Sequence, residues 1–145
     1  MKHLNLINKA FLLQKTTLFG KLDLDLLLTI SDKMEMVQFR EKEKIFQCDQ
    51  EAYKMYLVIE GTVAIHNRER ILLAELGRGE FFGDEALFNE QLRGYGAEAT
   101  GPTTLLSLSR THLLSILMEC PQVSIALLEA YTANIAFRER DYRKR

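Results

Sequence analysis

Residues 80–96, EFFGDEALFNEQLRGYG, are the part of this chain best suited to bind a ligand. The glycines allow tight turns, and DEALF predicts a one-turn helix whose first backbone amides can bind an anion. Arg93 follows shortly afterwards and can close over the same anion with two parallel hydrogen bonds. Asp84 adds an acceptor for hydroxyl groups. The stretch therefore predicts a site for a ligand that carries a phosphate and hydroxyls.

A simpler interpretation of the same residues is a surface loop in which Arg93 pairs with Asp84 or Glu85. Exposed ion pairs of this kind are common and contribute little to stability. The two interpretations differ in the effect of removing Arg93. Loss of one partner of a buried charged pair costs about 2–5 kcal/mol of binding free energy. This is a large part of the total of about 8 kcal/mol that holds a micromolar ligand. Loss of an exposed pair changes little.

The elements that must position this stretch are short strands between helical ends. Residues 6–36 have apolar side chains at helical spacing with a break near Gly20, and Asp23 or Asp25 can start the second helix. Residues 37–109 contain short apolar runs divided by polar turns, which predicts antiparallel strands, with ATGPTTLLSLS as the last one. The helical period returns at residue 110, where Ser109 or Thr111 can cap one helix and Pro121 can begin the next.

This order of elements predicts one mainly β domain, an antiparallel β-roll or jelly-roll barrel with flanking helices. We divide it into an N-terminal helical segment (1–36), a β-roll (37–109) and C-terminal helices (110–145). The candidate phosphate-binding segment lies at 82–95.

Composition narrows the class of protein. A chain of 145 residues fits a single core, and a formal net charge of −1 predicts no strong attraction to nucleic acid or membrane. The basic end, FRERDYRKR, is typical of a solvated helix terminus. Cys48 and Cys120, without a signal peptide, predict free thiols and a cytoplasmic location.

No enzymatic site is expected in this chain. A metal-dependent roll enzyme needs several histidines that converge on one ion, whereas His3, His66 and His112 belong to three different predicted elements. The chain has no nucleophile elbow, no Walker loop and no dinucleotide fingerprint. We therefore predict no catalytic residue, no metal and no cofactor.

Several motifs resemble the cyclic nucleotide-binding domain family, which includes modules of cAMP-dependent kinase regulatory subunits, catabolite-activator-type regulators and cyclic-nucleotide-gated channels. FGDEAL at 82–87, followed by Arg93-Gly94, is similar to the family's phosphate-binding cassette. The stretches TTLFGKLDLDLLLTIS, MYLVIEGTVAIH, ILLAELGRGEFFG and LLSLSRTHLLSIL resemble its N-terminal helix, its strands and its B helix.

The resemblance implies cAMP or cGMP as the ligand. Arg93 and the amides of Ala86 and Gly94 would bind the cyclic phosphate, and Asp84 would accept a hydrogen bond from the ribose 2′-hydroxyl. The expected ligand-binding residues are Phe82, Gly83, Asp84, Glu85, Ala86, Leu87, Arg93, Gly94 and Tyr95. Tyr131 and Ile135 in the final (C) helix are candidates for a lid over the base, and this helix would transmit the signal.

The chain also departs from the family pattern. Asp84 is one methylene shorter than the usual glutamate, and Tyr95-Gly96 replace small residues, so that Tyr95 would crowd the base or stack on it. A degenerate domain that binds a protein partner without a ligand is therefore the alternative, although the retained Arg93 argues against it.

The C-terminal part of the sequence bears on the candidate partners of this chain. The final helix has apolar residues on more than one face, which would suit either a homodimer or packing against the roll. Other domains of a longer protein are further candidate partners. The sequence after Pro121 has room for one helix and not for a helix-turn-helix domain, so no nucleic-acid contact is expected through this chain.

Overall fold

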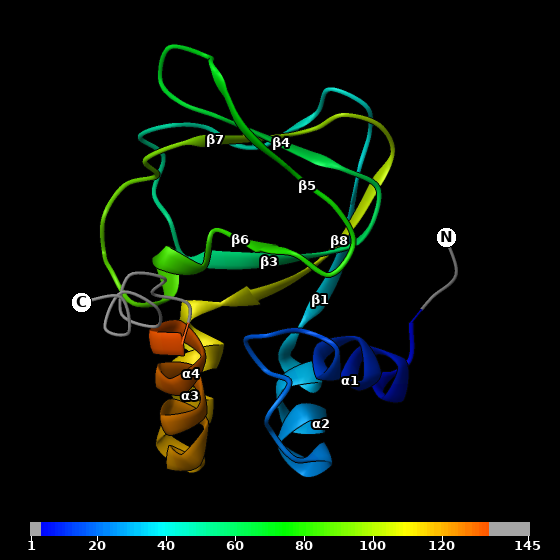
Figure 1. Ribbon diagram of the computed structural model, residues 1–145, viewed down its shortest axis with the longest axis vertical. Coiled ribbons are helices and arrows are strands. Elements are labelled where there is room, and N and C mark those ends of the chain that lie inside the picture. Colours follow the sequence, from blue (N-terminus) through cyan, green and yellow to red (C-terminus); the bar gives the residue numbers. More distant parts are fainter. Residues whose placement is uncertain (1–3, 134–145) are drawn as a thin grey trace, which may run out of the picture.

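The computed structural model describes residues 4–133, which form two antiparallel four-stranded sheets above a layer of helices (Figure 1). One sheet has the strand order β1-β8-β3-β6 and the other β2-β7-β4-β5. The expected β-roll with flanking helices is therefore confirmed. The strands are β1 (Glu35–Phe39), β2 (Lys44–Phe46), β3 (Lys54–Glu60), β4 (Val63–His66), β5 (Leu72–Leu76), β6 (Phe81–Phe82), β7 (Gly96–Ala99) and β8 (Thr103–Ser109).

The helices begin where side chains can cap them. The helices are α1 (Leu6–Gln14), α2 (Leu24–Lys33), α3 (Arg110–Glu119) and α4 (Pro121–Ala133). The Asp23 carboxylate accepts a hydrogen bond from the Leu26 amide, and the Ser109 hydroxyl accepts one from the His112 amide. Of the predicted alternatives, Asp23 and Ser109 are thus the caps, and Pro121 begins α4 as expected.

Two boundaries differ from the sequence-based expectation. The predicted helix to residue 36 is wrong, because α2 ends at Lys33 and β1 begins at Glu35, which pairs with Ser107. Met36 packs against the core beneath the first sheet, and Val37 packs against the core inside the roll. The apolar residues near this boundary therefore fit both the alternating pattern of a strand and the spacing of a helix. ATGPTTLLSLS also forms the end of β7 and all of β8, with a turn between them, rather than one strand.

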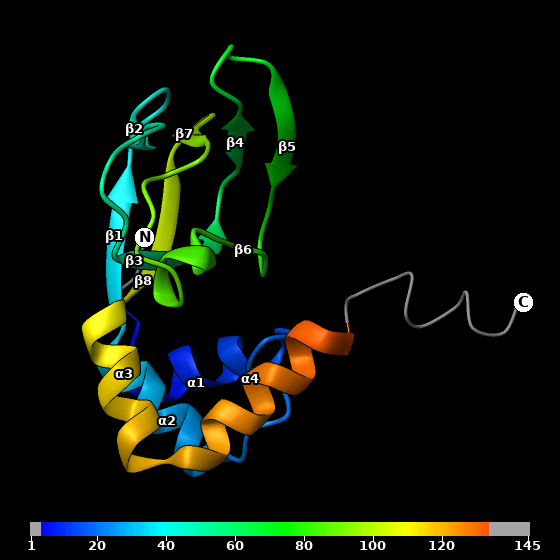
Figure 2. The same ribbon diagram turned by 90° about the vertical axis from the view of Figure 1, so that its left-hand side faces the viewer.

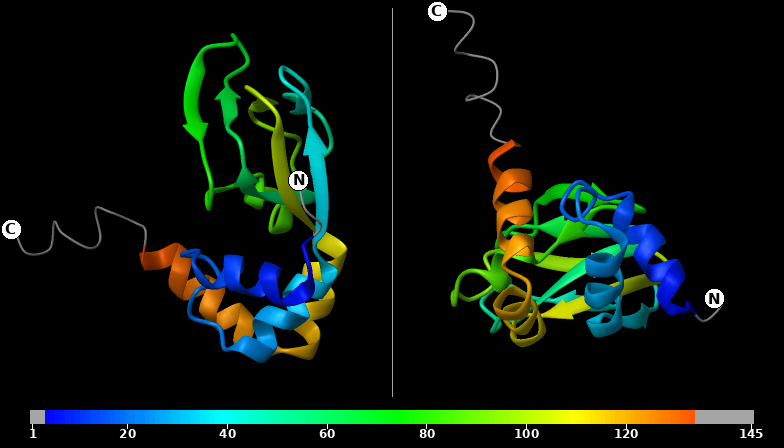
Figure 3. Two further views of the ribbon diagram at one scale, coloured as in Figure 1. Left: turned by 90° about the vertical axis from the view of Figure 1, so that its right-hand side faces the viewer. Right: turned by 90° about the horizontal axis from the view of Figure 1, so that it is seen from below.

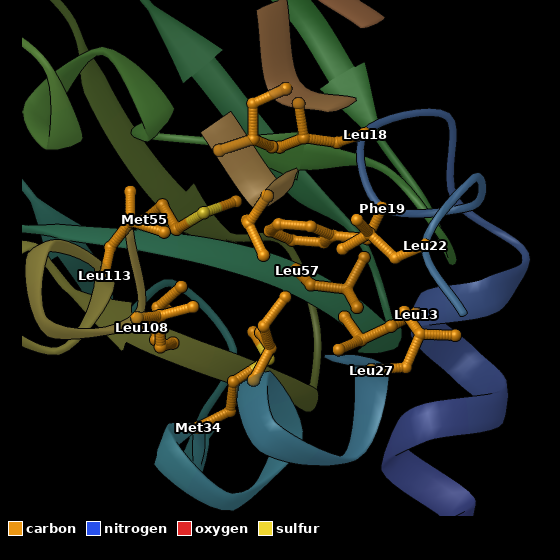
Figure 4. Close-up of a cluster of buried hydrophobic side chains, with 14 of the residues drawn as sticks. Leu13, Leu18, Phe19, Leu22, Leu27, Met34, Met55, Leu57, Leu108 and Leu113 are labelled. Carbon is orange, nitrogen blue, oxygen red and sulfur yellow. The ribbon is translucent and has the colours of Figure 1, made fainter. Parts of the chain in front are cut away.

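Strand β3 separates two hydrophobic cores. Met55 and Leu57 face the helices and pack in the cluster that contains Phe19, as the close-up in Figure 4 shows. Val58, on the opposite face of the strand, packs inside the roll. Both faces of β3 are buried, so its sequence is apolar at nearly every position.

The helices lie together under the first sheet (Figure 2), and the view from below shows α4 along one side of this layer, with α1 and α2 on the other side (Figure 3). Between residues 4 and 133, no single helix has the length and apolarity to cross a bilayer. Helices α3 and α4 meet those criteria only when joined, and they are bent by 116° at their junction.

We predict that Leu108→Ala lowers the free energy of unfolding by about 2–5 kcal/mol, because Leu108 is fully buried between the sheet and the helices. Chemical denaturation measures this change. Leu128→Ala is the matched control, since Leu128 is 62% exposed, and it should change the same quantity by less than about 0.5 kcal/mol. Equal losses in both variants would contradict the assigned core.

Candidate functional site

The candidate site begins with a glycine turn between β6 and a short 3-10 helix, η1 (Asp84–Leu87). Gly83 has φ = 74°, in the left-handed region that favours glycine. A Cβ atom at this position would lie 2.9 Å from Arg93 Nη1 and 3.2 Å from the Lys54 carbonyl oxygen. Ala86 and Leu87 are buried and anchor η1 against the body of the domain. The turn therefore requires glycine for both backbone conformation and space.

The Arg93 side chain lies inside this turn and is only 4% exposed. Its Nη2 donates a hydrogen bond to the Lys54 carbonyl at 2.7 Å, and its Nη1 donates one to the Gly83 carbonyl at 3.2 Å. The guanidinium carbon lies 3.9 Å from the centroid of the Phe46 ring. The surface placement in the surface-loop interpretation is therefore wrong, because the arginine is buried against backbone carbonyls and an aromatic face. The ion pair with Glu85 that this interpretation named is present, at 3.6 Å.

The charge of Arg93 is incompletely compensated. Its nearest carboxylate oxygen, Glu85 Oε1, is 3.6 Å from Nη1 and belongs to an exposed side chain. Arg93 Nε is buried and has no hydrogen-bond partner. Burial lowers the pKa of Arg93 from its ordinary value, while the negative charge of Glu85 opposes this shift. Arginine nevertheless stays protonated in proteins, so a buried cation with a free donor remains.

Aromatic side chains fill the roll beside Arg93. Phe46, Tyr56 and Phe82 lie with ring centroids 5.2–6.1 Å apart, and Tyr56 stacks on Phe82. Tyr95 packs on Phe46, and its hydroxyl accepts a hydrogen bond from the Gly83 amide at 2.7 Å. Burial is the main cause that raises the pKa of the Tyr95 phenol, so this group is neutral at physiological pH. The Gly83 amide is thus already hydrogen-bonded to Tyr95 within the protein.

Helix α4 reaches the same turn through Tyr131. The Tyr131 hydroxyl donates a hydrogen bond to Asp84 Oδ2 at 2.8 Å, and its ring packs edge-on against Phe88. Of the two lid candidates, the structure thus brings Tyr131 to the cassette, whereas Ile135 lies outside the described residues. The Ala86 amide, expected to contact phosphate, donates to the Gly83 carbonyl at 3.2 Å, and Gly94 is exposed.

Arg110, the first residue of α3, also belongs to the site, although the sequence did not predict it. Its Nε donates to the Ala86 carbonyl at 2.7 Å, and its Nη2 donates to the carbonyls of Asn89 and Ala52 at 2.8 and 3.0 Å. The residue thereby ties η1 to the start of α3. An arginine directly after a helix cap is usually solvated, so its type and position gave no signal of this role.

The family assignment follows from comparison with known proteins. Residues 36–120 match the family model described as "Cyclic nucleotide-binding domain", which is more than half of the chain. The chain belongs to the cyclic nucleotide-binding domain family, whose members are regulatory modules.

Individual relatives agree with this assignment. The chain is 30% identical over 89 residues to the cAMP-dependent protein kinase type I-alpha regulatory subunit of Mesocricetus auratus, a match to 58% of this chain and 52% of that protein. It therefore spans about half the length of this relative.

Solved structures share the fold. The N-terminal domain of a transcriptional regulator from Streptomyces coelicolor A3(2) has a TM-score of 0.80 and 26% identity, over 88% of this chain and 94% of that one. A cyclic nucleotide-binding-like protein from Brucella abortus has a TM-score of 0.67 and 25% identity, with 77% and 98% covered. The sensor domain of the regulator DNR from Pseudomonas aeruginosa has a TM-score of 0.74 and 22% identity, over 88% of this chain and 89% of that one. At this identity, the similarity supports the fold alone.

We predict that Gly83→Ala lowers the free energy of unfolding by about 1–3 kcal/mol, because a Cβ atom meets Arg93 and the left-handed φ becomes strained. Denaturant titration measures the loss. Gly77→Ala is the control, since no atom lies within 4 Å of its added Cβ and its φ is not in the left-handed region. A stable Gly83→Ala protein would show that the turn is misplaced.

Arg110→Met is expected to lower the free energy of unfolding by about 1.5–3 kcal/mol, because it keeps the aliphatic stem and removes the charged donors to the carbonyls of η1 and its neighbours. Amide exchange should also quicken in residues 84–89. Arg40→Met, at an exposed position, provides the same chemical change without these contacts. If both variants behave alike, Arg110 does not brace the cassette.

Proposed function

We propose that this domain is a sensor that binds cAMP, cGMP or a related cyclic nucleotide and responds through its C-terminal helix. The observation that carries the proposal is the buried Arg93 guanidinium, whose Nε has no partner and whose 3.6 Å ion pair is with the exposed carboxylate of Glu85. Such a group stabilises an anion strongly, because its low-dielectric surroundings strengthen the interaction and its geometry is already fixed. A cyclic phosphate has the required charge and size.

The roles of the cassette residues follow from this arrangement. Arg93 would bind the exocyclic oxygens, with amides from η1 and Gly94 at the same phosphate, and Asp84 would accept the ribose 2′-hydroxyl. Ligand entry requires the Arg93 contacts to the Gly83 and Lys54 carbonyls to rearrange. Because Asp84 also contacts α4 through Tyr131, a change at the cassette would be transmitted to that helix.

The wider roles are proposed on the same basis. Similarity to a kinase regulatory subunit and to the N-terminal domain of a transcriptional regulator supports a regulatory module without catalysis or a cofactor, connected to other domains or to a second copy. The free thiols Cys48 and Cys120 suit a reducing cytoplasm.

A second candidate function has its own observation. Tyr95 already occupies the Gly83 amide, and aromatic rings fill the roll beside Arg93, as in a domain that no longer admits a ligand. Such a domain would act as a protein-interaction module. Direct titration separates the two candidates.

Calorimetric titration with cAMP and cGMP tests the proposal. We expect micromolar binding of at least one nucleotide, and a loss of about 2–5 kcal/mol of binding free energy in Arg93→Ala. Arg93→Lys should also bind weakly, because it keeps the charge and lacks the planar fork.

Arg68→Ala is the control, since it removes the same charge from an exposed pair with Asp49. Thermal melts establish that each variant is folded. Unchanged affinity in a folded Arg93→Ala protein contradicts the assigned site, and absence of heat with either nucleotide favours the interaction module.

A further inference from the structure

One exposed carboxylate lies beside the buried cation of the cassette. Glu85 Oε1 is 3.6 Å from Arg93 Nη1, and no other carboxylate between residues 4 and 133 forms an ion pair with that guanidinium. The Arg93 side chain is buried, whereas the Glu85 side chain is 46% exposed. Glu85 is therefore the member of this ion pair that meets solvent.

The charge of Glu85 acts on Arg93 more strongly than the charge of Asp84 does. Burial lowers the pKa of Arg93, and Glu85 is the main group that opposes this shift, whereas Asp84 is the weakest of the opposing groups. The Asp84 carboxylate instead accepts a hydrogen bond from Tyr131. After burial, the negative charge of Glu85 is also the next cause that raises the pKa of the Tyr95 phenol. In the ligand-free cassette, Glu85 is thus the partial counter-ion of Arg93.

We propose that Glu85 sets the affinity of the cassette, because its carboxylate opposes the binding of an anionic ligand at Arg93. This inference rests on the proposed function and specifies how the same site is regulated. An anion bound by the Arg93 guanidinium lies close to Glu85, since that carboxylate is already 3.6 Å from Nη1. Two negative charges at such a separation repel each other.

The effect depends on charge and proximity, and it does not require the ligand to occupy the place of one particular atom. Because the Glu85 side chain is exposed on one side, it can turn toward solvent when an anion binds. The ion pair with Arg93 is then lost, and part of the repulsion remains. Glu85 therefore lowers the affinity of the site for an anion without closing it.

Calorimetric titration with cAMP tests this role. Glu85→Gln keeps the size of the side chain and removes its charge, so we expect it to bind cAMP about three- to tenfold more tightly than the unaltered protein. Glu90→Gln is the matched control, since Glu90 Oε1 is also 3.6 Å from an arginine, Arg110 Nη1, and is exposed. It should change the affinity by less than about twofold. Thermal melts establish that both variants are folded.

Salt separates an effect of charge from an effect of shape. The Debye length falls from about 10 Å at 0.1 M salt to about 3 Å at 1 M salt. The gain in cAMP affinity of Glu85→Gln over the unaltered protein should therefore shrink to less than about twofold at the higher concentration. A gain that is the same at both concentrations would show that the substitution reshapes the turn, and it would overturn the counter-ion role.

The outcomes separate this inference from the proposed function. If the unaltered protein binds cAMP and Glu85→Gln binds it no more tightly than Glu90→Gln does, the role of Glu85 is wrong while the sensor function stands. If only Glu85→Gln binds cAMP, the role of Glu85 is supported and the sensor function of the unaltered chain fails. If neither protein binds cAMP, both fail.

Discussion

The cassette depends on the burial of one guanidinium group. Arg93 closes the turn from within, since its two terminal nitrogens donate to the carbonyls of Gly83 and Lys54 and its plane rests on Phe46. These contacts join β3, the glycine turn and β2 around one cation. Backbone bonds from Arg93 to Gln50 and from Asp49 to Arg93 hold the same residue to the loop after β2. Removing the charge would therefore alter the shape of the cassette, in addition to any affinity for a ligand under the proposed function.

Under the proposed function, the same charge would give the site two states, one without and one with an anion. Backbone carbonyls are weak partners for a buried cation compared with a phosphate, because they are dipoles and not anions. The contacts of Arg93 hold the ligand-free cassette together. They do not satisfy all the hydrogen-bond donors of the guanidinium group, because Nε has no partner. Under the proposed function, an anion would supply the missing interaction and displace hydrogen bonds that are individually modest.

The sequence predicted the features of this structure that depend on neighbouring residues, and it did not predict those that depend on tertiary contacts. Asp23, Ser109 and Pro121 mark helix starts because capping and the fixed φ of proline act over a few residues. The β-roll followed from short apolar runs, and Gly83 from the cassette motif. The helix end near Met36 was missed because apolar residues there satisfy both helical and alternating patterns. Tyr131 was named as a lid candidate, yet its bond to Asp84 spans 47 positions and depends on tertiary packing, as do the three carbonyl contacts of Arg110.

Burial of β3 on both faces would limit how a signal crosses the domain under the proposed function. Met55 and Leu57 belong to the core beneath the sheet, and Val58 belongs to the core inside the roll. A slip of one residue along this strand would exchange the two sets of side chains, which the packing of both cores forbids. The strand is thus a fixed partition between the inside of the roll and the helices. Under the proposed function, a signal between them would pass around its end, where η1, Arg110 and Tyr131 meet, and the small segments at that edge would be the ones that move.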